Sequence, residues 1–359
     1  SKNDFSIDST NFKSFWISQI IKPLSNYKIR KTMRYFLISL SAIFLFTACS
    51  GKKYFEPEDV SSNIELNKES MSSSITSMNK IGATLDNKKV ITAQGISSFE
   101  LPENFDFLNV SADGKIIATN YINKILIGSE ERIVKDVVVA ASLKDNKLAL
   151  VYSNNTIELI DIKTNKTLFK EYLPISLAND TRITNPYFMG NLILFPTLNG
   201  KVIIVSSQTN ESIRNISVDP DSQFNNIISL NVIDNSQTLI VASPNKVVSI
   251  SSKEIITKNY EVRDIIVNKE DVYIATIDGQ IIKLTPNLVE VAKKKYKYAK
   301  IHALGFSDSL YAVESQGYLI NVNHDFTDDR IYKFNFDNEE RMIAIGNKIY
   351  FDSKYITLP

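Results

Sequence analysis

The segment "LALVYSNNTIELIDI" (Leu148–Ile162) places two apolar, β-branched runs on either side of a short polar turn. Asn155 stands in that turn, where a tight hairpin needs a residue that tolerates positive φ. Three further segments repeat the pattern clearly: "LILFPTLNGKVIIVSS" from Leu192, "VYIATIDGQIIKLT" from Val272 and "LYAVESQGYLINVN" from Leu310. Weaker copies surround Asn123, Lys246 and Lys354. Each segment predicts a β-hairpin.

These hairpins recur at a nearly regular interval, because their turn residues lie on average about 38 positions apart. Four short strands need about that length, and a period near 40 is typical of propeller blades. Candidate outer strands (168–173 and 213–218) and inner strands (264–267 and 342–345) complete the units. The pattern predicts an all-β protein, a β-propeller of four-stranded antiparallel blades over residues 90–359. Two packed β-sandwiches explain the period less well.

The number of blades follows from the hairpins and from the end of the chain. Seven hairpins predict seven blades, and the last blade has only three candidate strands, at 342–345, 348–351 and 355–358. Ring closure then requires a strand from the N-terminal side, either Val90–Thr92 or Ser97–Leu101. If both of these belong to a blade of their own, the count is eight. The sequence leaves seven and eight open.

A secretory signal precedes the propeller. Residues 33–48, "MRYFLISLSAIFLFTA", combine Arg34 with an apolar run from Phe36 to Phe46 and a small residue at the end. The run is too short to span a bilayer, which needs about 20 apolar residues. We therefore expect translation to start at Met33 and residues 1–32 to be an untranslated or mis-annotated upstream extension.

Cys49, the single cysteine, directly follows this signal. The motif Phe46-Thr47-Ala48-Cys49 resembles a bacterial lipobox, which implies that Cys49 becomes the first mature residue and carries three acyl chains. Two or more chains hold a protein stably on a membrane. Ser50 is not the Asp that marks inner-membrane retention in the well-studied sorting system, so we expect the periplasmic face of the outer membrane. Residues 49–80, rich in Ser, Asn, Lys and Glu, predict a flexible tether.

A more specific motif occurs in two of the hairpin units. "LIDIKTNKTLFK" (159–170) resembles the "ALDAKTGKVLWK" repeat of PQQ-like propellers: Asp161 matches, Asn165 replaces the glycine and Phe169 the tryptophan. "IVSSQTNESIRN" (204–215) is a fainter copy. With the lipoprotein signal, the chain resembles the BamB family, propeller lipoproteins of the outer-membrane β-barrel assembly machinery. This resemblance implies a protein–protein interaction scaffold that is an accessory subunit in barrel assembly.

The sequence offers little for catalysis. Residues 49–359 carry 34 basic and 38 acidic residues, a balance that does not favour nucleic acid. His302 and His324 lie in separate hairpin units, whereas a zinc site needs three or four donors. PQQ-dependent dehydrogenases stack the quinone on an aromatic ring, often Trp, and hold Ca²⁺, but residues 49–359 contain no Trp and no acidic cluster with ligand spacing. We expect no enzyme, cofactor, metal or small-molecule substrate. The alternatives are a component of a flagellar or secretion apparatus, and a PQQ-binding quinoprotein.

Two loops, at Asn179–Pro186 and Asp219–Asn226, account for the two longest intervals between successive hairpin turns. Extra loop length on a rigid propeller suits partner contacts, and aromatic and Arg side chains dominate interface hot spots. The candidate contact residues in or beside these loops are Arg182, Tyr187, Phe188 and Phe224.

The charge run "KKKYKYAK" (Lys293–Lys300) predicts an exposed outer strand whose lysines discourage pairing with another edge. Its alternative role is a docking patch for an acidic partner or for lipid headgroups.

Overall fold

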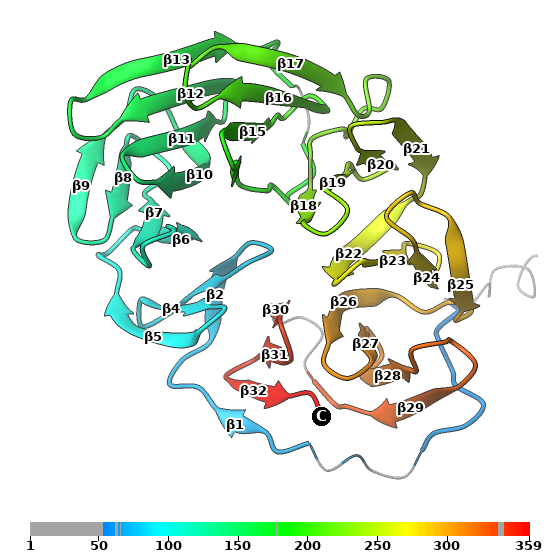
Figure 1. Cartoon of the computed structure of the whole chain (residues 1–359). Helices are drawn as coiled ribbons and strands as arrows, with labels where there is room; N and C mark the ends of the chain where they lie inside the picture. The colour runs from blue at the N-terminus through cyan, green and yellow to red at the C-terminus, as the bar shows by residue number, and fades with distance from the viewer. Residues whose placement is uncertain (1–52, 62–63, 65, 177–178, 337–340) are drawn as a thin grey trace, which may run out of the picture. The chain divides into compact units, whose positions relative to one another are not determined.

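Short antiparallel strands make up all the regular structure in the computed structural model, which describes residues 53–61, 64, 66–176, 179–336 and 341–359. The described strands form eight sheets of four strands each. Figure 1 shows these sheets as blades around a common centre, so the predicted β-propeller is confirmed with eight blades. The predicted signal peptide and Cys49 lie outside the described residues.

The blades follow one another along the chain, and in each the first strand lies nearest the centre (Figure 1). Blades 1 to 4 comprise β2 (Ile75–Met78), β3 (Ala83–Leu85), β4 (Lys89–Thr92), β5 (Gly95–Glu100); β6 (Asp106–Val110), β7 (Ile116–Thr119), β8 (Lys124–Ile127), β9 (Glu130–Ile133); β10 (Val138–Lys144), β11 (Lys147–Tyr152), β12 (Thr156–Asp161), β13 (Lys166–Tyr172); β14 (Tyr187–Met189), β15 (Leu192–Pro196), β16 (Lys201–Ser206), β17 (Ser212–Ser217). Blades 5 to 8 comprise β18 (Ser229–Ile233), β19 (Thr238–Ala242), β20 (Lys246–Ile250), β21 (Ile255–Asn259); β22 (Val262–Asn268), β23 (Asp271–Thr276), β24 (Gln280–Leu284), β25 (Glu290–Lys295); β26 (Ile301–Phe306), β27 (Leu310–Glu314), β28 (Tyr318–Val322), β29 (Asp329–Lys333); β30 (Met342–Ile345), β31 (Lys348–Phe351), β32 (Lys354–Thr357), β1 (Glu69–Ser70).

An N-terminal strand closes the ring, as predicted, but it is a different strand. β1 pairs antiparallel with β32, with Glu69 opposite Tyr355 and Ser70 opposite Lys354. The two candidate closing segments, 90–92 and 97–101, lie in β4 and at β5 of a complete first blade, which is the eight-blade alternative that the sequence left open. The propeller thus extends N-terminally past residue 90, and β1 and β2 come from the segment 49–80 that the sequence favoured as a tether.

The predicted turn residues have the backbone conformation that a tight hairpin requires. Asn155, Gly200, Gly279 and Gly317 have φ of 62°, 77°, 82° and 88°. At Gly279 a Cβ would lie 2.4 Å from the Tyr296 carbonyl oxygen, so glycine there satisfies both the positive φ and the close backbone approach.

The repeat motif acts through its turn. The Asp161 carboxylate accepts hydrogen bonds from the Lys163 and Thr164 N–H groups, both at 2.9 Å, and Asn165 adopts φ of 56°. In blade 4 the Ser206 hydroxyl takes the same place and accepts from the next turn's N–H groups at 3.1–3.2 Å. Phe169 packs against Phe195 of blade 4, with ring centroids 6.3 Å apart. The motif therefore sets the turn between the third and fourth strands and the contact to the next blade.

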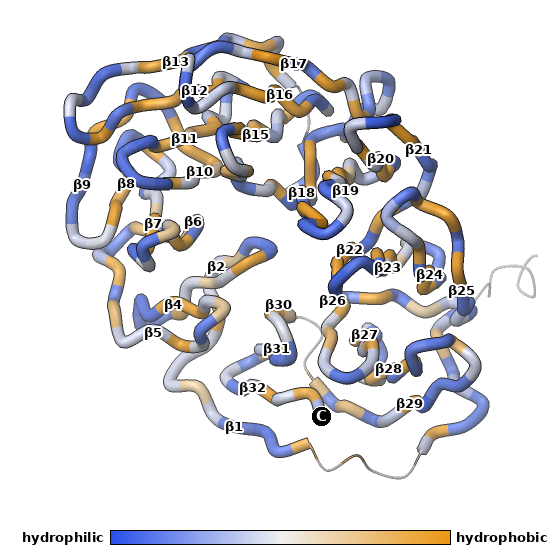
Figure 2. Tube along the Cα trace, viewed as in Figure 1, coloured by the Kyte–Doolittle hydropathy of each residue, from blue (hydrophilic) through white to orange (hydrophobic). Residues whose placement is uncertain are grey.

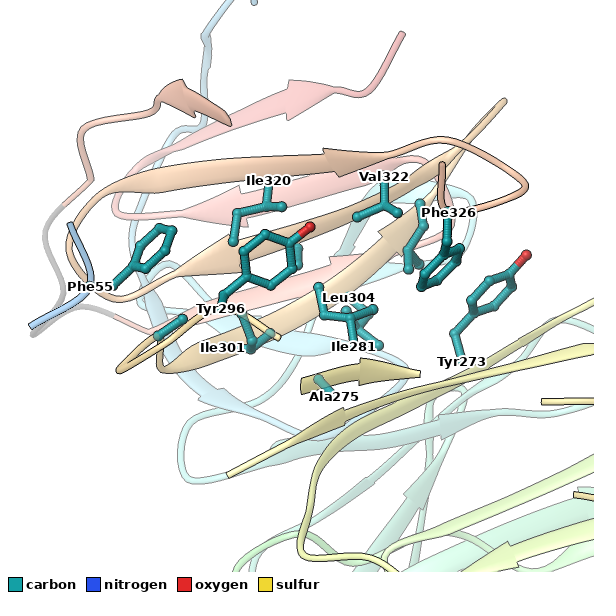
Figure 3. Packing of buried hydrophobic residues seen from close by; sticks show 13 residues of the cluster. Phe55, Tyr273, Ala275, Ile281, Tyr296, Ile301, Leu304, Ile320, Val322 and Phe326 are labelled. Carbon is teal, nitrogen blue, oxygen red and sulfur yellow. The ribbon is translucent and has the colours of Figure 1, made fainter. Parts of the chain in front are cut away.

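The core is divided among the blade interfaces. The described residues form eight hydrophobic clusters, and each joins two neighbouring blades, including blades 8 and 1. Figure 2 shows hydrophobic residues along the strands and hydrophilic residues at many of the turns. Figure 3 shows the cluster between blades 6 and 7, where Ala275 and Ile281 face Leu304 and Ile320. Stacking of one blade on the next buries both faces of each sheet.

Ahead of β1, the described residues 54–61, 64 and 66–68, which we call the strap, follow the outside of blades 7 and 8 (Figure 1). At its start, the buried ring of Phe55 lies edge-on to Tyr296 and Tyr318, with centroids 6.1 and 5.7 Å away. Ser61 then donates its N–H to the Ile331 carbonyl of β29 at 2.8 Å. Ile64 and Leu66 pack against the cluster between blades 7 and 8. The strap is thus part of the folded body.

We expect Phe55→Ala to destabilise the propeller by about 2–3 kcal/mol, somewhat less than a large-to-small change at the centre of a core, because the strap can partly relax. The neighbouring change Tyr54→Ala removes a ring that is 50% exposed and is the matched control. Urea unfolding followed by fluorescence and circular dichroism measures both. Equal stability of the two variants would show that the strap is not packed as described.

Candidate interaction site

One face of the propeller carries the links between consecutive blades and the turns between the second and third strands of each blade. We call it the loop face. Five aromatic side chains of the blades and their links are at least 40% exposed, and all five lie on this face: Tyr121, Tyr172, Tyr187, Phe224 and Tyr298. Ile122, Ile175 and Ile277 add exposed aliphatic side chains there. The loop face therefore offers the residue types that anchor protein interfaces.

The four residues proposed from the sequence occupy different environments. Tyr187 and Phe224 are exposed on the loop face, at 41% and 46%. Phe188 is half-buried and packs on the cluster between blades 3 and 4. Arg182 points into the ring, where its guanidinium donates to the Val262 and Arg263 carbonyls of blade 6 at 2.8 and 2.9 Å. Arg182 and Phe188 thus hold the loop in place, and Tyr187 and Phe224 stay candidates for partner contact.

The long link between blades 3 and 4 is fixed by polar contacts to several blades. Asn185 donates to the Leu108 carbonyl of blade 2 at 2.8 Å and accepts from the Ala141 N–H of blade 3 at 3.0 Å. The fully buried Asn226, in the link before blade 5, accepts from the Asp180 N–H at 2.7 Å and donates to the Arg182 carbonyl at 2.8 Å. These bonds hold residues 180–185 of the link in place against blades 2 and 3 and the link before blade 5.

A cavity of about 490 Å³ lies in the central channel, at the ends where the inner strands of blades 5 to 8 begin. The turn between β2 and β3 reaches toward the centre of the ring in Figure 1 and supplies part of the wall. Lys80 in this turn forms an ion pair with Asp264 of blade 6, and Asn79 donates to the Leu108 carbonyl at 2.8 Å. Blade 1 is thereby connected across the channel to blade 6.

The charged groups around this cavity differ in how they are neutralised. Burial opposes ionisation of Asp180, but hydrogen bonds from Arg182 outweigh it and hold the pKa of that carboxyl below its usual value. Burial, and then the nearby charge of Arg263, lowers the pKa of His302, so its imidazole is neutral at pH 7. The His302 Nε2 atom is buried and has no hydrogen-bond partner among the described residues, and the ring lies edge-on to Phe336 at 5.8 Å.

Sequence reasoning did not find this cavity. Its lining comes from the first residues of inner strands and from a turn in the blade that the hairpin pattern missed. The only signal was the recurrence of basic residues just before or at the start of strands, as at Arg263, His302 and Arg341.

Two properties bear on the chemistry of the described residues. They contain no group of three or more His, Cys, Asp or Glu side chains that could hold a metal ion. Over the same part of the chain, no helix is both long and apolar enough to cross a membrane.

The chain is similar to known proteins in sequence and in fold, although no protein-family model matches it. It is 28% identical over 383 residues to the plasminogen-binding protein PgbB of Helicobacter pylori strain J99, an alignment that covers 89% of this chain and 70% of that protein. PgbB of strain 26695 matches with the same identity and coverage.

Among solved structures, BamB from Moraxella catarrhalis superimposes with a TM-score of 0.62 at 11% identity, covering 81% of this chain and 98% of that one. The C-terminal WD40 domain of Sif2 superimposes with a TM-score of 0.56 at 12% identity, covering 85% and 100%. The chain therefore has a BamB-like propeller fold. A role in protein–protein interaction fits this fold and the similarity to a plasminogen-binding protein.

We expect Lys80→Met to destabilise the protein by about 1–2 kcal/mol, because it leaves the largely buried carboxylate of Asp264 without its cation. Lys115→Met is the control, since Lys115 pairs with Asp113 at a site where both side chains are more than half exposed. Urea unfolding measures the free energy of unfolding of both variants. Equal values for the Lys80 variant and the control would mean that the Lys80–Asp264 pair contributes nothing to stability.

Proposed function

We propose that this chain is a non-enzymatic lipoprotein scaffold on the periplasmic face of the outer membrane, which binds protein partners through its loop face as an accessory subunit in outer-membrane β-barrel assembly. The observation that carries the proposal is the gathering of all five exposed blade aromatics on one face. The BamB-like fold supports barrel assembly as the setting.

The rigidity of the loop face favours docking. Binding to a flexible loop costs the entropy of ordering it, whereas a loop already fixed by hydrogen bonds binds with little of that cost. Asn185 and Asn226 fix the long link through bonds to four neighbouring positions. Tyr187, which directly follows this link, is therefore a preorganised aromatic anchor, and Phe224, within the second long link, is the other candidate anchor.

The anchor and the strap together limit how far the propeller extends from the membrane. If Cys49 carries the lipid, only five residues separate it from Phe55, and these six residue steps reach at most about 20 Å at 3.3–3.6 Å per residue. A flexible tether of some thirty residues would have allowed a larger distance. Because Phe55 packs on Tyr296, next to the loop face, the rim of blades 6 and 7 lies nearest to the anchor.

For the anchor, we expect Cys49→Ser to release the protein into the soluble periplasmic fraction or to leave it as uncleaved precursor, because no other residue of the chain can accept the lipid. Fractionation and intact-mass analysis measure both outcomes. Processed mutant protein that still fractionates with the outer membrane would contradict the lipoprotein proposal.

For docking, we expect photo-crosslinkers at Tyr187 and Phe224 to trap the barrel-inserting subunit in intact cells, and Tyr187→Ser with Phe224→Ser to lower the amounts of outer-membrane barrel proteins without abolishing growth. Crosslinkers at Ile255 and Val289, exposed on the opposite face, are the controls. Normal barrel levels with crosslinks only to a motility or secretion complex would favour the alternative apparatus.

A second candidate function is plasminogen binding, which the similarity to PgbB over 89% of the chain favours. Surface plasmon resonance with the immobilised propeller and purified plasminogen tests it. Saturable binding that the loop-face variants weaken would support this function, and the absence of binding would remove it.

A further inference from the structure

The channel cavity has a strong imbalance of charge. Among the described residues, its lining contains four cationic side chains and a single carboxylate: Lys80, Arg182, Arg263, Arg341 and Asp264. The whole chain has a net charge of only +1, so this excess is local. Charges of one sign that line a cleft attract an anion more strongly than the same charges on an open surface.

Two of the four cations are already neutralised within the protein. Lys80 pairs with Asp264, and Arg182 forms a two-pronged pair with Asp180 at 2.6 and 2.8 Å. The Asp264 carboxylate also accepts hydrogen bonds from the Leu304 N–H at 2.7 Å and from the Ile265 N–H at 2.9 Å. These groups build the wall and have little capacity left for a ligand.

Within the part of the chain that the structure describes, no ion pair neutralises the other two cations. Arg263 uses its Nε to donate to the Ile301 carbonyl at 2.9 Å, which orients the guanidinium and leaves its two Nη groups. Arg341 stands directly before β30, and no described carboxylate pairs with Arg263 or Arg341. Guanidinium groups bind carboxylates through two parallel hydrogen bonds, which makes arginine the preferred residue for this recognition.

The remaining lining is mainly apolar, with Ile183, Ile228, Ile265 and Met342 around the basic groups. A volume of about 490 Å³ falls within the range of small-ligand sites, and it accommodates two or three side chains of a peptide. The ligand that fits this lining has a carboxylate next to aliphatic groups.

We propose that the channel cavity binds a carboxylate-bearing peptide, contributed by the protein partner as an acidic segment or a C-terminal carboxylate with aliphatic neighbours. This inference rests on the proposed docking function and gives it a specificity site. The aromatic residues of the loop face hold the partner, and Arg263 and Arg341 select an acidic segment at the channel.

The test is fluorescence anisotropy of an eight-residue labelled peptide of alternating Leu and Glu with a free C-terminal carboxylate, added to the whole propeller. The matched probe replaces Glu by Gln and amidates the C-terminus. We expect the acidic peptide to bind at least tenfold more tightly than the neutral one, and added salt to weaken its binding. Equal affinity for the two peptides would overturn the proposal.

The variant series is Arg263→Gln with Arg341→Gln, the single change Arg341→Gln, and Arg341→Lys. We expect at least a tenfold loss in the double variant, a smaller loss in the single variant, and partial recovery with lysine, which keeps the charge but not the planar fork. Arg341→Gln guards against misfolding, because it removes no hydrogen bond within the described residues. Lys163→Gln with Lys253→Gln, exposed on the opposite face, is the control. Unchanged affinity in a folded double variant would overturn the proposal.

Citrate as a competitor separates a partner peptide from a free small carboxylate. Tight citrate binding that depends on both arginines, without binding of the peptide, would overturn the assignment to a partner. The docking function and the cavity inference can fail separately. If Tyr187→Ser with Phe224→Ser abolishes partner binding, the docking function is supported. If the double arginine variant and Arg341→Gln then bind the peptide as the unmodified protein does, the cavity inference is refuted.

Discussion

The pairing of β1 with β32 is the contact on which the ring depends. An eight-bladed propeller without closure exposes the edge of its last blade and the faces of two blades, and such unpaired edges favour aggregation. Here the closing strand has only two residues, Glu69 and Ser70. Its neighbours add to it: Met71, which is buried, donates its N–H to the Ser353 carbonyl at 2.7 Å, and Lys68 donates to the Phe334 carbonyl at 3.0 Å. Contacts of the strap, including Lys68, and of Met71 therefore add to closure by β1.

This arrangement connects the proposed anchor to the stability of the fold. The chain passes from the rim of blades 6 and 7, along blades 7 and 8, into β1 and then directly into blade 1. Blade 1 in turn supplies the β2–β3 turn that enters the channel and pairs Lys80 with Asp264. One continuous segment thus closes the ring, narrows the channel and ends near the residue that we expect to carry the lipid.

Sequence reasoning recovered the repeat but left its first copy open, with only the segments 90–92 and 97–101 as candidate strands for it. The strong hairpins have Asn or Gly at the turn and long β-branched strands, as at Asn155 and Gly279. Blade 1 has β3 and β4 of three and four residues, and its turn uses Lys88 at φ of 65°, a residue that does not mark a turn by type. Composition also failed to distinguish a packed strap from a tether, because Tyr54 and Phe55 are only two aromatic residues in a segment rich in Ser, Glu and Lys. The same limit applies to the site. Exposure of Tyr187 and Phe224 followed from loop length, whereas Arg182 turned inward to backbone carbonyls of a blade 80 residues away.

The most direct test of ring closure is a disulfide between β1 and β32, built as Ser70→Cys with Lys354→Cys in the Cys49→Ser background. Residues 70 and 354 are Cα partners in the sheet, a separation that suits a disulfide. Closure by β1 predicts that this pair oxidises in the folded protein and raises the Tm relative to the reduced form, while Ser97→Cys with Lys354→Cys, which tests closure by residues 97–101, stays reduced. A reduced 70–354 pair together with an oxidised 97–354 pair would contradict closure by β1.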